Sequence, residues 1–539
     1  MPAPQEGAAA QSYHKQETVR SPYLQAAYKA ATLTIPSLFP DSGDASQADR
    51  YRKDLPTPWQ GLGARGLNNV ASKLLLTLFP PSQPIFKYQI SPSLTEGIED
   101  DQETAKEVSK IEKLLAQREI ELSELIESDA IRPALHEAVR QLLVAGNVLI
   151  HLPDRGGMRV FRLNRYVVRR DSYGTVIEAV LKETMARDAL PEPVREWMEQ
   201  QFPYRPAKSH DESRQDEVDI YTHIKLEPGG KSYKVCQEID GLQVPGSEGT
   251  YPSDAPEFIF LRLTRVDGED YGRGLIEENI GDLTSYDALQ QSIITTAANQ
   301  ADLKWLVDPN GQTNVRHLKD APSGEYVAGR KKDVDALTVD KFADMRSATE
   351  VRDDIKVSLS FVFLLNSAVR RNGERVTAVE IREVARELED SFGGVYTILS
   401  QDLQLNVVKR YERRAEKAGN LTSIPKNVVK PVIVTGLESI GRSHDLDKIR
   451  LFFDELTRLA TIDPEVARYL HTGEWINRIG TALAVPQKGL VRDGEEVQAE
   501  IQKERQDAQR AELMSRAAPN AINQLGSAMQ NAQAPQEEP

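Results

Sequence analysis

Hydrophobic residues in the first quarter of the chain recur every three or four positions, which is the spacing of one face of an α-helix. Prolines at positions 80 and 81 end one of these runs, because proline cannot continue a helix. The first twenty residues are small and polar, and they predict a flexible N-terminal arm. The pattern then predicts four helices, which start near Ser21, Gly66, Glu96 and Pro133.

Between residues 148 and 263 the hydrophobic period changes to two, which is typical of strands with one buried face. Glycine-containing turns predict two hairpins, one across residues 171–174 and one across residues 228–230. Strands and helices do not alternate here, so the pattern favours an α+β fold over a doubly wound sheet. The predicted strands cover residues 148–152, 158–163, 166–170, 175–181, 219–226, 232–239 and 258–263.

The helical period returns at Leu275 and predicts two long helices, over residues 275–303 and 346–365. The segment between them contains turn signals and weak strand patterns at residues 325–328 and 336–339. A basic stretch with three arginines and one glycine, NSAVRRNGERV, follows the second helix.

A capping box formed by Thr377 and Glu380 predicts the start of another long helix. Its apolar positions continue at helical spacing, and one strand is predicted over residues 431–435. Further helices are expected up to about residue 516, followed by a flexible tail rich in Ala, Gln, Asn and Pro.

Composition places the chain among ordinary globular proteins, because 40% of its 539 residues are hydrophobic and 28% are charged. This length predicts two to four domains. Cys236 is the single cysteine, so no intrachain disulfide can form, and a reducing, intracellular place of folding is expected. Apolar runs are too short to span a bilayer and no signal peptide is recognisable, which predicts a soluble, unexported chain.

The formal net charge of −15 argues against a protein that wraps nucleic acid with its whole surface. Much of this charge is local, since residues 96–129 hold 12 acidic and 4 basic residues, a net charge of −8. A solvated helix face accounts for that segment.

Sequence signals for enzyme chemistry are weak. Residues 61–66, GLGARG, match the G-x-G-x-x-G spacing of dinucleotide sites, but the proline-containing segment before them does not predict the required buried strand. Residues 324–332 approach a phosphate-binding loop but lack its Lys-Ser/Thr pair. The eight histidines form no metal-ligand pattern. The sequence therefore predicts no catalytic residue, cofactor or metal. A nucleotide-dependent enzyme using either stretch, or a helical scaffold without a DNA role, remains the alternative.

Several long strings carry a more specific signal, among them EDYGRGLIE (residues 269–277) and LNSAVRRNGERVTA (residues 365–378). Together these strings resemble the portal protein, or head-to-tail connector, of short-tailed podophages of the autographivirus type. The resemblance covers about residues 60–450 and is weaker at both ends. The other matching stretches are residues 63–74, 144–149, 267–273, 387–404 and 435–442.

The resemblance implies an α+β, mainly α, portal-type subunit that assembles as a ring. Together with the composition of the two ends, it gives a map of nine parts. They are a flexible N-terminal arm (1–20), a wing (21–274), a first stem helix (275–303), a small mixed α/β clip (304–345), a second stem helix (346–365), a tunnel loop (366–376), a long helix and return to the wing (377–440), a helical crown (441–516) and a flexible tail (517–539).

The function that the resemblance implies is a channel of about twelve subunits at one capsid vertex. Double-stranded DNA would enter through it during packaging and leave during ejection, while a separate terminase hydrolyses ATP. The expected location is the virion, after assembly in the host cytoplasm. The expected partners, with no membrane among them, are other copies of the chain, double-stranded DNA, the terminase large subunit, a tail adaptor protein, the major capsid and scaffolding proteins, and internal core proteins at the crown.

Two sets of basic residues are the candidate site. In the tunnel loop, arginines are expected to form a mobile constriction that touches phosphates without reading bases; the alternative is that they pair with carboxylates of neighbouring subunits. In the clip, basic residues are expected to contact partners, although seven basic and seven acidic residues between positions 304 and 345 also fit an ordinary solvated surface. The tunnel-loop residues are Arg370, Arg371, Arg375 and the hinge Gly373; the clip residues are Arg316, Lys319, Arg330, Lys331 and Lys332.

Overall fold

The structure is a computed structural model, and its chain divides into two compact units, Met1–Leu437 and Glu438–Pro539. The elements described below all belong to the first unit. The structure describes residues 7–40, 55–80, 85–90, 102–201, 217–301, 304–337, 342–365, 384, 387–388, 391, 393, 398–419, 421, 429–433, 503, 506 and 508–509.

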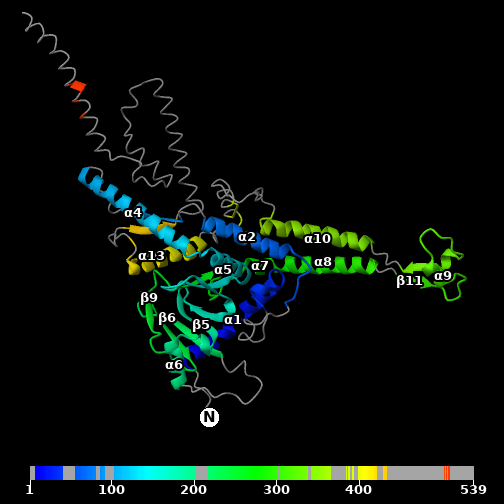
Figure 1. Ribbon diagram of the computed structural model, residues 1–539, viewed down its shortest axis with the longest axis horizontal. Helices are drawn as coiled ribbons and strands as arrows, with labels where there is room; N and C mark the ends of the chain where they lie inside the picture. The colour runs from blue at the N-terminus through cyan, green and yellow to red at the C-terminus, as the bar shows by residue number, and fades with distance from the viewer. Residues whose placement is uncertain are drawn as a thin grey trace, which may run out of the picture. The chain divides into compact units, whose positions relative to one another are not determined.

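The described residues form a mixed helix and sheet fold in which helices predominate, as the sequence predicts (Figure 1). A π-helical turn, Ser400–Leu405, immediately precedes helix α13 (Asn406–Ala418). The α-helices are α1 (Ala8–Thr32), α2 (Leu62–Leu78), α4 (Gln102–Ser128), α5 (Arg132–Ala145), α6 (Glu192–Gln201), α7 (Leu275–Glu278), α8 (Ile280–Ala301), α9 (Val315–Asp320), α10 (Phe342–Val362) and α13 (Asn406–Ala418).

The strands of the described region pair in antiparallel fashion in four sheets. The largest has the order β4-β5-β6-β7-β8, with β9 also paired to β7; the others are β10-β2-β3, β1-β13 and β11-β12. Both predicted hairpins are confirmed, since β4 pairs with β5 and β6 with β7. The strands are β1 (Phe86–Ile90), β2 (Asn147–His151), β3 (Arg159–Phe161), β4 (Tyr166–Arg170), β5 (Val176–Ala186), β6 (Glu217–Leu226), β7 (Ser232–Ile239), β8 (Leu242–Gln243), β9 (Gly249–Pro252), β10 (Phe258–Arg262), β11 (Lys304–Val307), β12 (Val334–Leu337) and β13 (Val429–Ile433).

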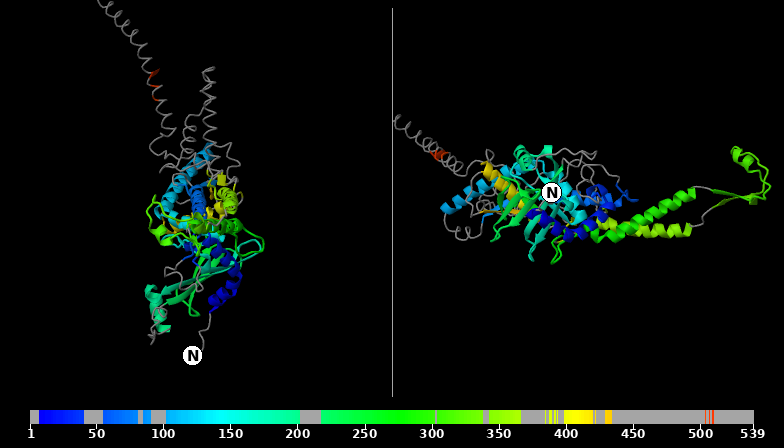
Figure 2. Two further views of the ribbon diagram at one scale, coloured as in Figure 1. Left: turned by 90° about the vertical axis from the view of Figure 1, so that its right-hand side faces the viewer. Right: turned by 90° about the horizontal axis from the view of Figure 1, so that it is seen from below.

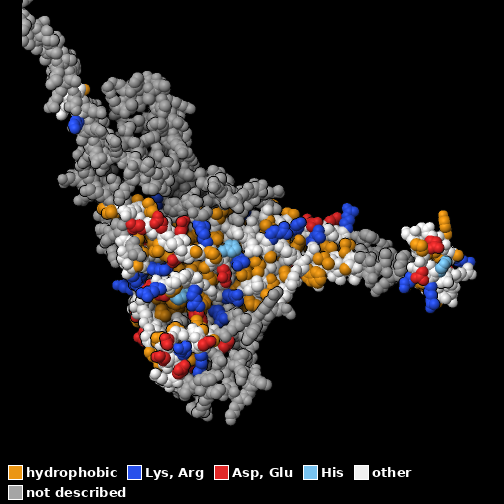
Figure 3. Space-filling model, viewed as in Figure 1, with side chains coloured by type: hydrophobic (Ala, Val, Ile, Leu, Met, Phe, Trp, Pro, Cys, Tyr) orange, Lys and Arg blue, Asp and Glu red, His pale blue; other side chains and the backbone are white. Residues whose placement is uncertain are grey.

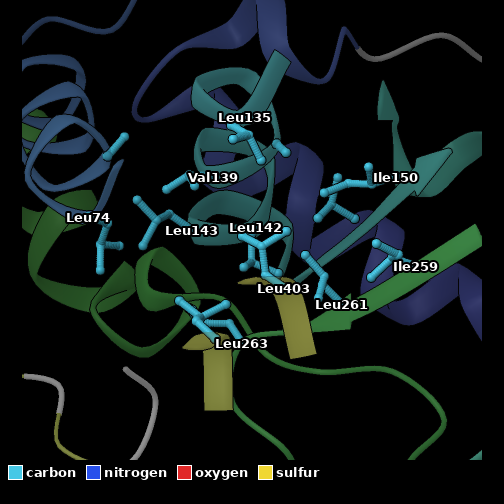
Figure 4. Close-up of a cluster of buried hydrophobic side chains, with 14 of the residues drawn as sticks. Leu74, Leu135, Val139, Leu142, Leu143, Ile150, Ile259, Leu261, Leu263 and Leu403 are labelled. Carbon is cyan, nitrogen blue, oxygen red and sulfur yellow. The ribbon is translucent and has the colours of Figure 1, made fainter. Parts of the chain in front are cut away.

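The main core forms where α5 and the β10-β2-β3 sheet pack together with α2 (Figure 4). Helix α5 starts with Pro133 in its first turn and ends at Gly146, whose φ of 69° suits glycine. A side chain at Gly146 would also collide with the backbone of Arg273 and Gly274. The close-up shows side chains from all three parts of this core, including Leu74, Leu142, Ile150 and Ile259.

The prediction of a flexible arm over residues 1–20 is wrong from Ala8 onward, because helix α1 begins there. Its first turn packs against β4, β5 and β6, where Tyr13 joins a buried cluster with Val167 and Val180. Arg20 is only 2% exposed and donates hydrogen bonds to the carbonyl oxygens of Asn164 and Tyr166, at 2.9 and 3.0 Å. These contacts with the sheet stabilise a helix that its small, polar sequence does not predict.

A carboxylate from the sheet also caps helix α1. The side chain of Glu238 on β7 accepts hydrogen bonds from the backbone amides of Ala9 and Ala10, at 3.0 and 3.4 Å. These amides have no partner within the helix, and the positive end of the helix dipole favours a negative group beside them. Glu238 therefore fixes the first turn of α1 on the sheet.

Replacing Glu238 by alanine is expected to release the first turn of α1 and to cost about 1 kcal/mol of stability, as the loss of a helix cap does. Hydrogen exchange at the amides of residues 9–12 should become faster, while exchange in α5 stays unchanged. Glutamine at position 238 is the matched control, since its amide oxygen can still accept these hydrogen bonds. Unchanged exchange in the alanine variant would show that the cap does not hold the turn.

The helical region after Leu275 differs from its prediction at Asn279 and at both ends of α10, which ends at Val362 rather than at residue 365. The expected helix over residues 275–303 is divided at Asn279, whose side-chain amide donates to the carbonyl oxygen of Leu275 at 2.9 Å. Helix α10 begins at Phe342 rather than 346, because residues 342–345 contain no helix-breaking residue. In each place the difference is local.

The segment between α8 and α10, which we call the connecting segment (residues 304–337), contains a two-stranded sheet and the short helix α9. The weak strand predicted over residues 325–328 is wrong, since β11 pairs directly with β12 and leaves residues 325–328 outside the sheet. Ala336 and Leu337 of β12 overlap the other weak prediction, which covered residues 336–339.

Helix packing explains two of the three glycines of the G-x-G-x-x-G spacing, Gly63 and Gly66. Residues 62–66 form the first turns of α2, and residues 55–60 before them contain no strand. A side chain at Gly63 would collide with the carbonyl oxygen of Leu33, and one at Gly66 with the ring of Phe363. Both glycines therefore allow close approach of neighbouring elements.

Candidate functional site

Helices α8 and α10 lie side by side along their length (Figures 1 and 2). Their contact buries Leu283 and Tyr286 of α8 and Leu359 of α10. Such a pair of long helices forms a rigid support between the connecting segment at one end and the main core at the other.

The end of α10 is held by polar side chains of α2. The amide of Asn69 donates to the carbonyl oxygens of Phe363 and Leu364, at 2.9 and 3.0 Å. Leu364 has a φ of 53°, so the chain leaves the helix in a left-handed conformation that is uncommon for leucine. The hydrogen bonds from α2 stabilise this exit, which lies directly before the arginine-containing loop of the sequence.

Lys73 of α2 connects the two ends of that loop. Its Nζ atom donates to the carbonyl oxygen of Leu364 at 3.1 Å, before the loop, and to Oε2 of Glu387 at 2.8 Å, after it. The Lys73 side chain is only 8% exposed. A buried ammonium group therefore links Leu364, directly after α10, to Glu387, and both contacts are charge-assisted.

The chain that follows the loop rejoins the core through both apolar and polar contacts. The apolar positions predicted at helical spacing, Val384, Leu388, Leu399 and Leu403, are buried. Within the π-helical turn, Asp402 pairs with Arg265, and Gln404 donates to the carbonyl oxygen of Leu78. Single π-turns of this kind occur often at functional sites.

Helix α13 is fixed next to the β10-β2-β3 sheet by Arg410, whose side chain is fully buried. Its Nε donates to the carbonyl oxygen of Leu152 and its Nη2 to Oδ1 of Asp154, both at 2.8 Å, and it also pairs with Glu257. Burial alone would raise the pKa of Asp154, but the hydrogen bond from Lys417 and the charge of Arg410 lower it. The carboxylate therefore stays charged and holds α13 in place.

A network around Asp333 organises the connecting segment. The Oδ2 atom of Asp333 accepts hydrogen bonds from the backbone amides of Gln312 and Thr313, at 2.9 and 3.0 Å, and from the Thr313 hydroxyl at 2.7 Å. The hydroxyl bond lowers the pKa of Asp333. Thr313 in turn accepts from the backbone amide of Arg330 at 2.9 Å, so both loops of the segment are tied together.

The predicted basic residues of this segment are all exposed, and within the described residues none of their side chains makes an ion pair. Apolar side chains accompany them, and Tyr326 is 100% exposed (Figure 3). The structure therefore places these basic residues on a surface with exposed hydrophobic groups. Arg316 and Lys319 lie on α9, Arg330 precedes the 3-10 turn Lys331–Asp333, and Lys331 and Lys332 lie within it.

The four tunnel-loop residues, Arg370, Arg371, Gly373 and Arg375, lie outside the described residues. The structure instead identifies residues that hold the loop ends, which the sequence does not reveal. In the sequence, Lys73 resembles an ordinary polar position of α2, because its partner Glu387 is 314 positions away. A buried lysine in an otherwise apolar helical run, ASKLLLTLF, is the one local signal of this role.

Residues 324–333 do not have the local structure that a phosphate-binding loop of a nucleotide-dependent enzyme requires. Residues 324–330 have no regular secondary structure, and a strand rather than a helix follows residues 331–333. Within the described residues, no group of three or more His, Cys, Asp or Glu side chains could hold a metal ion. No helix in the described part of the chain is long and apolar enough to cross a membrane.

Comparisons with known proteins assign the family. The model of the bacteriophage head to tail connecting proteins matches residues 6–491. The portal protein of Enterobacteria phage T3 is 40% identical over 92% of this chain and 90% of its own length. The portal protein of Escherichia phage T7 is 41% identical over 91% of this chain and 89% of its own. That of Enterobacteria phage SP6 is 30% identical over 94% of both.

The similarity to solved structures is weaker. A chain in the neck of an empty gene transfer agent particle aligns over 72% of this chain and 86% of its own, with a TM-score of 0.34 and 11% identity. That value is too low to support an argument, so the assignment depends on the sequence matches. Because these matches span most of the sequence, the chain belongs to the family of bacteriophage head to tail connecting proteins.

Proposed function

We propose that about twelve copies of this chain form a ring at one vertex of the capsid, through which double-stranded DNA passes during packaging and ejection. The match to head to tail connecting proteins over residues 6–491 carries this proposal. The ring belongs to the virion and assembles in the host cytoplasm. It works as a passive structural connector, and ATP is hydrolysed by a separate terminase.

In this ring, α8 and α10 are the stem helices and the connecting segment is the clip. The sheets and helices before residue 275 form the wing, and residues 441–516 form a crown that contacts internal core proteins. The major capsid and scaffolding proteins surround the ring. The rigid helix pair supports this assignment, because heterologous contacts close into a ring only when each subunit keeps a fixed shape.

The loop between Leu365 and Thr377 then faces the channel, where Arg370, Arg371 and Arg375 contact phosphates. Lys73 supports this role, since it binds Leu364 directly before the loop and Glu387, ten residues after Thr377, while Gly373 is proposed to allow the centre of the loop to move. Phosphate contacts carry no sequence information, which suits a channel that must accept a whole genome. The wall around these arginines is proposed to be mostly anionic, in keeping with the acidic net charge of the chain, so that DNA is not held too tightly for passage.

Native mass and negative-stain images of the purified protein test the ring. A particle with a central hole and a mass of about twelve times the 60.2 kDa chain is expected. A protein that stays monomeric under assembly conditions, or that binds ATP or NAD at micromolar concentrations as a small oligomer, would instead support the enzyme alternative.

The exposed basic residues of the clip are proposed to dock the terminase large subunit and later the tail adaptor. Reversing two of these charges, with Arg330→Glu and Lys331→Glu together, is expected to weaken terminase binding by about tenfold or more, since like charges would then face each other. Binding is measured by surface plasmon resonance on assembled rings.

The matched control reverses two exposed lysines of the β6-β7 hairpin, Lys225→Glu and Lys231→Glu. This pair changes the net charge by the same amount and should leave binding unchanged. If both double variants weaken terminase binding equally, binding depends only on the net charge of the ring. If neither variant changes binding, Arg330 and Lys331 do not dock the terminase.

A further inference from the structure

Helix α10 carries an apolar stripe that the described residues leave largely exposed. Asp354, Val357 and Phe361 follow one another at intervals of three and four, so they lie on one face of the helix. Val357 is 53% exposed and Phe361 is 65% exposed. An aromatic and a β-branched side chain in adjacent helical turns form a projection that water solvates poorly.

A different side of α10 borders a pocket of about 500 Å³. Lys356 and Ser360 line it from α10, and Trp59, Arg65 and Tyr286 line it from the neighbouring elements. Phe361 lies about 140° around the helix axis from Lys356, because each residue advances about 100°. The projection and the pocket therefore occupy separate sides of the same helix.

The pocket is preformed and partly aromatic. The backbone amide of Trp59 donates to Oδ1 of Asp287 at 2.7 Å, which fixes the chain that carries the indole ring. Trp59 is 46% exposed, and the ring of Tyr286 forms another part of the lining. Aromatic side chains at such a site favour a further aromatic ring, since aromatic pairs gain free energy beyond their buried area.

Charges beside the two features are opposite in sign. Asp354 is one turn from Val357 on the projecting stripe, while Arg65 and Lys356 border the pocket. All three are exposed, and none forms an ion pair with another described residue. A second copy of the chain would bring an acidic projection to a basic pocket, and opposite charges at the rim of an interface select the correct orientation.

We propose that Phe361 and Val357 of one copy insert into the Trp59-lined pocket of the next copy, with Asp354 beside Arg65 of that copy. This inference rests on the ring proposed above and identifies a surface that closes it. Two different patches pair in such a contact, so it is heterologous, and a heterologous contact that repeats around an axis closes into a ring. The occupant is therefore a second copy of the same chain.

Engineered cysteines test the contact directly. The variant carries Phe361→Cys and Gln290→Cys, because Gln290 also lines the pocket, and Cys236→Ser removes the native thiol. Mild oxidation of assembled rings is expected to give a ladder of covalently linked chains on a non-reducing denaturing gel. Variants with only one of the two cysteines should give no ladder, since a heterologous contact does not bring two identical residues together.

Two further measurements separate a direct contact from an indirect effect. Phe361→Ala is expected to raise the concentration for half-assembly of the ring by about 30-fold, as for a residue at the centre of an interface. Tyr173→Ala, which removes an exposed aromatic ring from the β4-β5 turn, is the control and should not change this concentration.

A charge swap tests the polar part of the contact. Asp354→Arg and Arg65→Asp should each impair assembly, and their combination should restore it.

The outcomes distinguish this contact from the proposed function. If the unmodified protein forms no ring, the proposed function fails and the contact with it. If rings form but the paired cysteines give no ladder and Phe361→Ala assembles like Tyr173→Ala, the contact is wrong and the ring remains. If oxidation instead joins the cysteines at positions 361 and 290 within one chain and gives no ladder, the chain's own residues cover Phe361. This result also overturns the contact.

Discussion

Replacing Lys73 by methionine is expected to lower the free energy of unfolding by about 2–3 kcal/mol and to impair DNA retention in assembled particles. Methionine keeps the length and apolar character of the side chain but removes its charge and its hydrogen bonds. The carbonyl oxygen of Leu364 and the carboxylate of Glu387 then each lose a partner. Because Glu387 is 26% exposed, water recovers part of the loss, which is why the estimate lies below that for a fully buried pair.

Thermal unfolding and hydrogen exchange of residues 360–365 measure the effect. Faster exchange there would show that the start of the loop has become free, while exchange in the β6-β7 hairpin should not change. Glu387→Gln is the companion variant, since its amide oxygen still accepts from Lys73 and a smaller loss is expected. If Lys73→Met unfolds at the same temperature as the unmodified protein, Lys73 does not hold the loop ends.

Many of the elements before residue 275 could be predicted because their sequence signals are local. Strands β6 and β7 alternate apolar and polar residues on either side of Pro228-Gly229-Gly230, and both the strands and their pairing are confirmed. Helix α5 combines Pro133 in its first turn with Gly146 at its end, so its limits were also predictable. Here, neighbouring residues in the sequence determine the structure.

The features that were missed depend on residues far apart in the sequence. Helix α1 begins at Ala8 because Arg20 and Glu238 bind it to a sheet more than 140 positions away, and no local pattern contains that contact. Strand β1 was not predicted, since its partner β13 lies at residues 429–433. The role of Lys73 was missed for the same reason, because its partner Glu387 lies 314 positions away. Resemblance to a family predicted a loop after α10 and a clip between α8 and α10, whereas only the structure identified Lys73 and its contacts with Leu364 and Glu387.

Replacing Arg370 and Arg371 together by alanine is expected to leave the ring intact and to make packaged DNA leak about tenfold faster or more. A loss of about 1.4 kcal/mol in the free energy of DNA binding to the ring is enough for a tenfold change, and every subunit loses two positive charges that are proposed to face phosphates. Native mass reports on the ring, and nuclease-protected DNA per particle over time reports on retention. Retention by the unmodified particle should also fall as salt increases, and the double variant should depend less on salt.

The same variants decide between phosphate contact and the alternative, in which these arginines pair with carboxylates of neighbouring subunits. Lysine at both positions keeps the charge but not the planar fork of donors, so it should preserve DNA retention if phosphates are the partners. If subunit carboxylates are the partners, the alanine variant should instead lower the melting temperature of the ring, because each subunit contact loses charge-assisted hydrogen bonds. Normal retention by a stable alanine ring would exclude a role for Arg370 and Arg371 in holding DNA, and the constriction would then depend on other residues of the channel wall.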